Sequence, residues 1–251
     1  MDLGGACFTI GLWFDQPVFP SVLLAVGDVL VAGGGRYEGD VTVGPSDAVF
    51  AGGYDIRGYR SLDSRVVEGT MAGTVEGTVY GLRLRLPGAV GPASVGFATT
   101  PAAVPAQEHP VEIDMAADML LFCLDDLDRK DRKQAKARER ALLRRMKAVC
   151  AALDPAYAVV RVESGDPSPA PAVLAAGTEG LGSSAFVSHR LATRPALVAP
   201  IAALALLCKT QDWGTGTQYE WGPARADRER GALIAADRAV SLAVGRLLAT
   251  R

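Results

Sequence analysis

Leu82-Arg83-Leu84-Arg85-Leu86 alternates leucine with arginine, which predicts a β-strand with one buried face and one face in solvent. The even positions from Phe8 to Phe14 are also large and apolar, so another strand is predicted near the N-terminus. Further strand candidates in the first half are Val41–Val43, Val49–Tyr59, Val66–Leu86, Val95–Ala98 and Val111–Met115. A loop is expected over Pro101–Pro110. The first half is therefore predicted to be rich in β-structure.

Helical patterns dominate the second half. Apolar residues recur with helical spacing in Arg129–Leu153 and again in Asp227–Ala249. Two more helices are predicted at Val18–Ala32 and Pro200–Lys209, the latter with proline in its first turn. The remaining segments are predicted as strands at Tyr157–Glu163 and Phe186–Leu191 and as a polar, aromatic loop at Thr210–Pro223.

Strands and helices do not alternate regularly, and no dinucleotide-binding fingerprint is present. This arrangement indicates an α+β fold with a mixed or antiparallel sheet, a β-rich N-terminal half and a helix-rich C-terminal half. No obvious linker divides the chain, so residues 1–251 are expected to form a single compact domain. Pseudo-halves 1–117 and 118–251 are the alternative.

Charge is distributed unevenly along the chain. Residues 1–128 hold 17 acidic and 6 basic residues, a net charge of −11. Residues 129–147 hold 10 basic and 2 acidic residues, a net charge of +8. The whole chain is nearly neutral, at −2. Such asymmetry bears on the choice of partner rather than on the fold.

The four cysteines are widely separated and form no C-x-x-C pair, which is typical of free thiols in a reducing compartment. The N-terminus lacks the basic region of a secretory signal. The most apolar windows, Val18–Ala32 and Ala196–Cys208, are shorter than the roughly 20 residues of a membrane span, and we interpret both as core helices. A cytoplasmic location without membrane association is therefore expected.

Catalytic and metal-binding signatures are weak. His109 precedes Pro110 in a predicted loop, and His189 falls in a predicted strand, where a core role is favoured over catalysis. Asp125, Asp126 and Asp128 could offer oxygen ligands to a divalent cation. Acidic residues just before a helix also cap its N-terminus, and we favour that interpretation while leaving cation binding open. No metal and no cofactor is predicted, and a non-catalytic role is favoured over an enzyme.

Two segments, 52–60 and 213–222, combine aromatic, charged and glycine residues in the manner of ligand pockets or binding hot spots. The candidate binding residues are Tyr54, Asp55, Arg57 and Tyr59 in the first segment and Trp213, Tyr219, Glu220 and Trp221 in the second. Two tight turns whose aromatic side chains cover the core are an equally weighted alternative.

The basic segment 129–147 spreads its charges around the predicted helix and interleaves no aromatic residue that could stack on bases. Because the rest of the chain is net acidic, nucleic-acid binding is disfavoured. The favoured interpretation is a solvated face that docks partly on the acidic half of the same chain. A surface for an acidic partner is the alternative.

These observations favour a non-catalytic, cytoplasmic protein that binds a macromolecular partner, foremost another protein, through an acidic surface or the aromatic loop. A bacterial toxin antidote or an assembly component would fit, because complementary charge steers association. The alternative is a small-molecule-binding protein or enzyme whose pocket is formed by the 52–60 and 213–222 loops.

Overall fold

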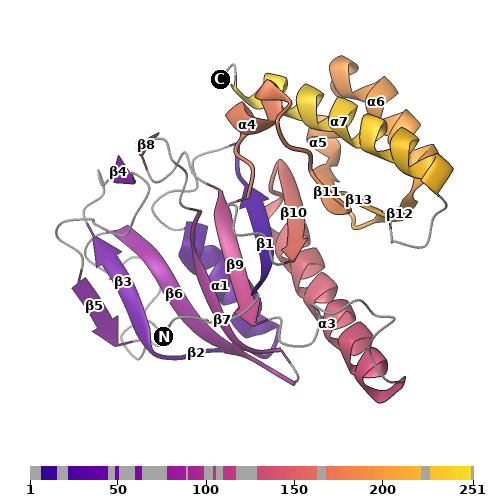
Figure 1. The fold of residues 1–251 in the computed structure, drawn as a ribbon. Helices are drawn as coiled ribbons and strands as arrows, with labels where there is room; N and C mark the ends of the chain where they lie inside the picture. Colours follow the sequence, from indigo (N-terminus) through magenta and orange to yellow (C-terminus); the bar gives the residue numbers. More distant parts are fainter. Residues whose placement is uncertain are drawn as a thin grey trace.

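The structure is a computed structural model that describes residues 7–15, 22–44, 49–50, 60–63, 78–88, 90–98, 104–105, 110–116, 129–162, 168–221 and 227–249. Its centre is an antiparallel sheet of 11 strands (Figure 1). The strands follow the order β12-β13-β11-β10-β1-β9-β7-β6-β3-β5, and β2 pairs with β6. Two short strands, β4 (Val49–Phe50) and β8 (Val104–Pro105), form a separate pair.

The strands of the main sheet are β1 (Cys7–Trp13), β2 (Arg36–Tyr37), β3 (Asp40–Gly44), β5 (Arg60–Asp63), β6 (Thr78–Leu86), β7 (Gly91–Phe97), β9 (Val111–Ala116), β10 (Tyr157–Val162), β11 (Ser184–Ser188), β12 (Lys209–Asp212) and β13 (Gly216–Glu220). The helices are α1 (Val22–Ala32), α3 (Arg129–Leu153), α4 (Pro171–Ala176), α5 (His189–Ala192), α6 (Pro195–Leu207) and α7 (Asp227–Ala249). The predicted α+β class, with a β-rich first half, is confirmed.

The leucine–arginine alternation forms β6. Leu82, Leu84 and Leu86 lie in the core, whereas Arg83 and Arg85 are exposed. Arg85 uses its exposed position to form an ion pair with Glu38, in which Nη2 donates to Oε1 at 2.9 Å. The strand pairs with β3 on one side and β7 on the other, so its apolar residues help to fill the middle of the sheet.

Helices α1 and α3 cover one face of the sheet. Helices α4, α6 and α7 cover the opposite face over strands β10, β11 and β13 (Figure 1). Strand β10 shows the division, because Ala158 belongs to the core under α1 and α3 while Tyr157 and Val159 belong to the core under α7. Since successive side chains of a strand point to opposite faces, β10 must be apolar on both. The two cores are thus the two sides of one continuous sheet.

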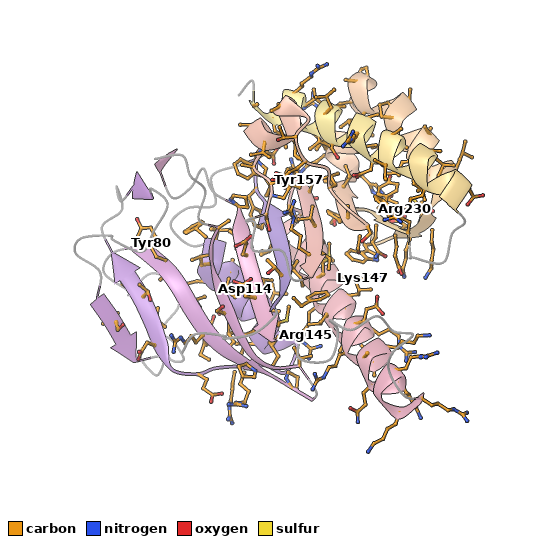
Figure 2. All side chains as sticks on the ribbon, viewed as in Figure 1. Tyr80, Asp114, Arg145, Lys147, Tyr157 and Arg230 are labelled. Atoms are coloured by element: carbon orange, nitrogen blue, oxygen red, sulfur yellow. The ribbon has the colours of Figure 1, made fainter. Side chains whose placement is uncertain are left out.

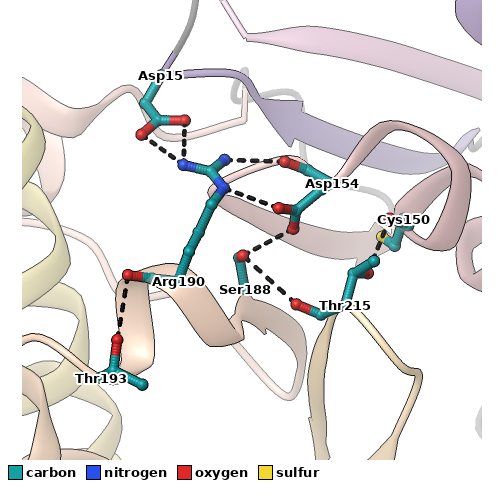
Figure 3. A network of polar contacts seen from close by, with 7 residues as sticks. All are labelled: Asp15, Cys150, Asp154, Ser188, Arg190, Thr193 and Thr215. Atoms are coloured by element: carbon teal, nitrogen blue, oxygen red, sulfur yellow. Dashed lines mark hydrogen bonds and ion pairs between the residues drawn. The ribbon is translucent and has the colours of Figure 1, made fainter.

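A polar network around Arg190 joins the ends of several elements (Figure 3). Arg190 Nη1 donates to the Asp15 carboxylate at 2.6 Å, just after β1, and Nε donates to Asp154 Oδ2 at 2.8 Å, just after α3. Ser188 Oγ donates to Asp154 Oδ1 at 2.7 Å. Thr215 Oγ1, in the turn of the β12–β13 hairpin, donates to the Cys150 carbonyl at 3.0 Å. The network therefore fixes the C-terminal end of α3 against β1, α5 and the hairpin.

The structure corrects several secondary-structure predictions. The predicted loop Thr210–Pro223 contains the hairpin of β12 and β13, and β8 lies within the predicted loop Pro101–Pro110. The predicted strand Phe186–Leu191 ends at Ser188, and His189 instead begins α5, where its side chain is partly exposed. Helix α6 begins at Pro195, so Pro200 lies inside the helix rather than in its first turn.

No helix in the described ranges is both long and apolar enough to span a membrane. The apolar window at Val18–Ala32 contains α1, which is largely buried, as predicted for a core helix.

Two glycines of α7 offer a matched test of the packing between α4 and α7. A Cβ atom at Gly245 would lie 2.2 Å from the backbone nitrogen of Ala175, whereas a Cβ atom at Gly231 would meet nothing within 4 Å. We expect Gly245→Ala to lower the free energy of unfolding by about 2 kcal/mol or more, because the backbone must move to admit the methyl group. Gly231→Ala should instead raise it by about 0.5–1 kcal/mol. Urea denaturation of both variants measures this, and equal effects would contradict the described packing.

A second prediction concerns the Arg190 network. The Asp15 side chain is only 3% exposed, so removal of Arg190 takes an ion pair away from a buried carboxylate. We expect Arg190→Ala to lower the free energy of unfolding by about 2–3 kcal/mol, near the low end for a broken buried pair because Arg190 itself is partly exposed. The exposed Arg194 is the control, and Arg194→Ala should change stability by less than about 0.5 kcal/mol. Equal losses in the two variants would contradict the importance of the network.

Candidate interaction surfaces

The first group of predicted binding residues, Tyr54, Asp55, Arg57 and Tyr59, lies outside the described residues, as do Asp125, Asp126 and Asp128. The involvement of both groups stays a prediction. Among the described residues, no three His, Cys, Asp or Glu side chains are placed so that they could hold a metal ion.

The second group lies on or beside the β12–β13 hairpin, and its aromatic residues mostly belong to the core. Trp213 is buried and stacks on Phe186 with 5.8 Å between ring centroids. Tyr219 is buried in the core beneath α7. Glu220 and Trp221 are partly exposed, and Glu220 lies 3.8 Å from the ammonium group of Lys209. Of the four predicted residues, these last two are therefore the ones that could touch a partner without a change in the core.

Two carboxylates on the sheet were not among the predicted binding residues, although Asp114 belongs to the acidic cluster that the sequence shows between Asp114 and Asp131. Glu112 and Asp114 lie on β9 and point to the face of the sheet opposite Val111, Ile113 and Met115, which the alternation within this strand could have indicated. Thr9 Oγ1 donates to Asp114 at 2.7 Å, and the backbone N–H of Ser168 donates to Glu112 at 2.6 Å.

Burial raises the pKa of both carboxyl groups, and these hydrogen bonds oppose the rise. A carboxyl group whose pKa lies closer to neutrality can act as an acid or a base. Each of the two is already held by a hydrogen bond from within the protein, so we assign them a structural role at the centre of the sheet.

Helix α6 has an unusual surface. Its 13 residues, PALVAPIAALALL, include no polar side chain, yet Leu197 and Leu204 are its only fully buried residues. The exposed residues of the helix are Pro195, Ala196, Val198, Ala199, Ala202, Ala203 and Leu206. The window Ala196–Cys208 therefore does not form the core helix predicted from the sequence, because only one side of α6 packs on the protein.

The exposure of α6 is large for individual side chains. Three large apolar residues in the described ranges are strongly exposed, and two of them, Leu206 at 85% and Val198 at 54%, belong to α6. The third, Ile234 at 45%, lies on α7, which packs against α6. An apolar helix usually hides all its sides, and contiguous apolar patches at a surface mark sites of association.

A second candidate surface is a line of cations on α3. Arg129, Lys133, Lys136, Arg140, Arg144 and Lys147 follow one another at intervals of three or four residues, so they share one face of the helix. We call these six residues the basic stripe. All are exposed except Lys147, which is partly exposed. The opposite side of α3 places Leu142, Met146 and Val149 in the core. Six of the ten basic residues in 129–147 thus share the outer face, while Lys130, Arg132, Arg138 and Arg145 lie at other positions around the helix, as the predicted spread of charge requires.

The basic stripe lowers the stability of α3. Cations at spacings of three and four repel one another by about 0.2–0.5 kcal/mol per pair. The first turn of α3 carries three basic residues, Arg129, Lys130 and Arg132, against one acidic residue, Asp131, next to the positive end of the helix dipole, whereas the last turn carries no basic residue. Within the described ranges, no ion pair joins a residue of the stripe to a carboxylate. The internal docking that was favoured from the sequence therefore finds no contact to support it there.

The repulsion can be measured with Lys133, which has Arg129, Lys130 and Lys136 as neighbours at spacings of three and four. Lys133→Gln should raise the free energy of unfolding by about 0.5–1 kcal/mol at low salt. In about 1 M salt the gain should largely vanish, because screening weakens interactions between exposed charges.

Lys209→Gln is the control, since it removes a cation that has a carboxylate neighbour at 3.8 Å. It should leave stability unchanged or lower it by up to about 1 kcal/mol. A loss of stability in Lys133→Gln would contradict this account, because it would mean that the chain itself supplies an anion to the stripe.

No protein-family model matches the sequence, and neither does any curated protein. Among solved structures, the chain is similar to a Pseudomonas aeruginosa T6SS protein, with 13% sequence identity and a TM-score of 0.44. The likeness covers 94% of this chain and 74% of that protein.

Proposed function

We propose that this chain is a non-catalytic protein that binds another protein, and that the exposed face of α6 is part of the contact surface. The observation that carries the proposal is a helix without a polar side chain that leaves Leu206 85% exposed. Burial of apolar area from water contributes about 25 cal/mol per Å². A partner that covers this face gains that free energy, which the chain alone does not.

The chemistry of α6 favours a protein over a membrane as the occupant. A helix that lies on a lipid surface combines an apolar face with a strongly charged one. No residue of α6 carries a charge, and its buried side packs on the chain's own core. A second protein can match the shape of such a face with its own apolar side chains, as in the centre of most protein interfaces.

The cytoplasm is the compartment we propose for this interaction. Cys150 is a buried free thiol, which is the state expected in a reducing environment. We favour two classes of function, a toxin antidote and an assembly component, because proteins of both classes act by binding a partner protein and not by catalysis. The acidic surface, Glu220 and Trp221 are further candidates for the contact.

Binding of a small molecule between the 52–60 and 213–222 segments is the alternative. Trp213 and Tyr219 would not line such a pocket in the present conformation, because both are buried in the core. Glu220 and Trp221 would have to supply the second side of the pocket.

The proposal is tested by capture of the tagged chain from cells of the species that makes it, followed by native mass spectrometry. The wild-type chain should carry a stoichiometric protein. Val198→Glu together with Leu206→Glu should lose that protein by at least about tenfold, because two charges would be buried against an apolar surface. Both positions are exposed, so the variant should remain folded, which circular dichroism can verify.

A matched control adds the same two charges elsewhere. Ala172 and Ala176 are exposed on α4, which also packs against α7. Ala172→Glu with Ala176→Glu should retain the partner. Absence of any protein on the wild-type chain would overturn the proposal, and a bound small molecule in its place would establish the alternative. Retention of the partner by the α6 variant would show that α6 is not the contact.

A further inference from the structure

We propose that the basic stripe of α3 is a docking surface for an acidic face of a protein partner, most simply an acidic helix that lies along α3. This inference rests on the proposed function and adds to it the chemistry of the partner. It depends on a different element from α6, so the two can fail separately.

The six residues of the stripe span 18 residue steps, which corresponds to about 27 Å along a helix. Figure 2 shows side chains projecting from the N-terminal end of α3, which extends at the lower right beyond the strands of the sheet. A partner can therefore approach the stripe without meeting the sheet. A helix that carries carboxylates at intervals of three and four residues would match its period.

Within the described ranges, the basic stripe takes part in no ion pair, although Lys136 and Arg140 both attract the Glu139 carboxylate of the same helix. Salt bridges within the described ranges join Arg36 and Arg85 to Glu38, Arg161 to Glu179, His189 to Asp212, Arg190 to Asp15 and Asp154, and Lys209 to Glu220. None of them includes a stripe residue. Basic residues at the start of a helix oppose its dipole, so the placement disfavours folding. Departures from local rules of stability are expected where a surface serves binding.

The charge of the rest of the chain favours a protein over a nucleic acid as the partner of the stripe. Outside residues 129–147 the chain has a net charge of −10, the difference between −2 for the whole and +8 for the segment. A duplex carries one charge per 1.7 Å and continues past both ends of a short stripe, so its phosphates would meet this negative charge. An acidic face of limited length gains the attraction and avoids the repulsion. The stripe also includes no aromatic residue for stacking on bases.

Two fluorescent probes test the inference in low salt. One is a helical peptide of alanine and glutamate with a glutamate at every third or fourth position, and the other is a 12-base-pair DNA duplex. The purified full chain should bind the acidic peptide more tightly than the duplex. A peptide of the same composition with its glutamates scattered around the helix should bind more weakly than the aligned one.

A charge-reversal variant and its control then locate the binding. The stripe variant carries Lys133→Glu, Lys136→Glu and Arg144→Glu, all at exposed positions. The control carries Arg83→Glu, Arg194→Glu and Arg230→Glu, which are also exposed and change the net charge equally. The stripe variant should lose at least about tenfold in affinity for the peptide, and the control should change by less than about threefold.

Equal losses in the two variants would overturn the inference, because net charge rather than the stripe would then govern binding. Tighter binding of the duplex than of the peptide, lost in the stripe variant, would instead assign the stripe to nucleic acid. No binding of either probe would also overturn it. All these outcomes are independent of the α6 capture experiment, so a protein partner held by α6 would leave the proposed function intact.

Discussion

The shared strand β10 is the constraint on which the rest of the structure depends. Its residues from Tyr157 to Val160 are apolar on both faces, because α1 and α3 cover one face and α4, α6 and α7 the other. Tyr157 and Val159 serve the second core, and Ala158 serves the first. The Arg190 network lies beside the beginning of this strand. Arg190 bonds both to Asp154, which precedes β10, and to Asp15, which follows the neighbouring strand β1 (Figure 3). The single domain expected from the sequence stays a prediction, which the continuous sheet favours over two halves.

Much of this arrangement could be predicted because local patterns determine it. The alternation in β6 and β1 and the periods of α3 and α7 led to elements close to those of the structure, with α3 and α7 matching at both ends. The hairpin of β12 and β13 could not be predicted in the same way. All four residues of β12 are exposed and polar, so no alternation distinguishes this edge strand from a loop. Its pairing with β13 depends on tertiary contacts.

The interaction surfaces were predictable to different degrees. The charge of α3 is visible in the sequence. The alignment of the stripe would also have been visible if each basic residue from Arg129 to Lys147 had been assigned its angle around the helix, because the stripe residues follow at intervals of three and four. The open face of α6 could not be found this way. A helix in which every residue is apolar has no amphipathic direction, so its packing on the rest of the fold decides which side is left exposed.

The two surfaces have one physical property in common, since each carries an unfavourable free energy that a bound partner would offset. On α6 it is apolar area in contact with water, and on α3 it is repulsion between aligned cations. Hydrogen exchange of the chain, alone and in complex with its captured partner, tests the account most directly. The account predicts slower exchange in the complex for the amides of α6 and for residues 129–147 of α3, with little change in β3 and β6. Protection confined to other elements, with α6 and α3 unchanged, would contradict it.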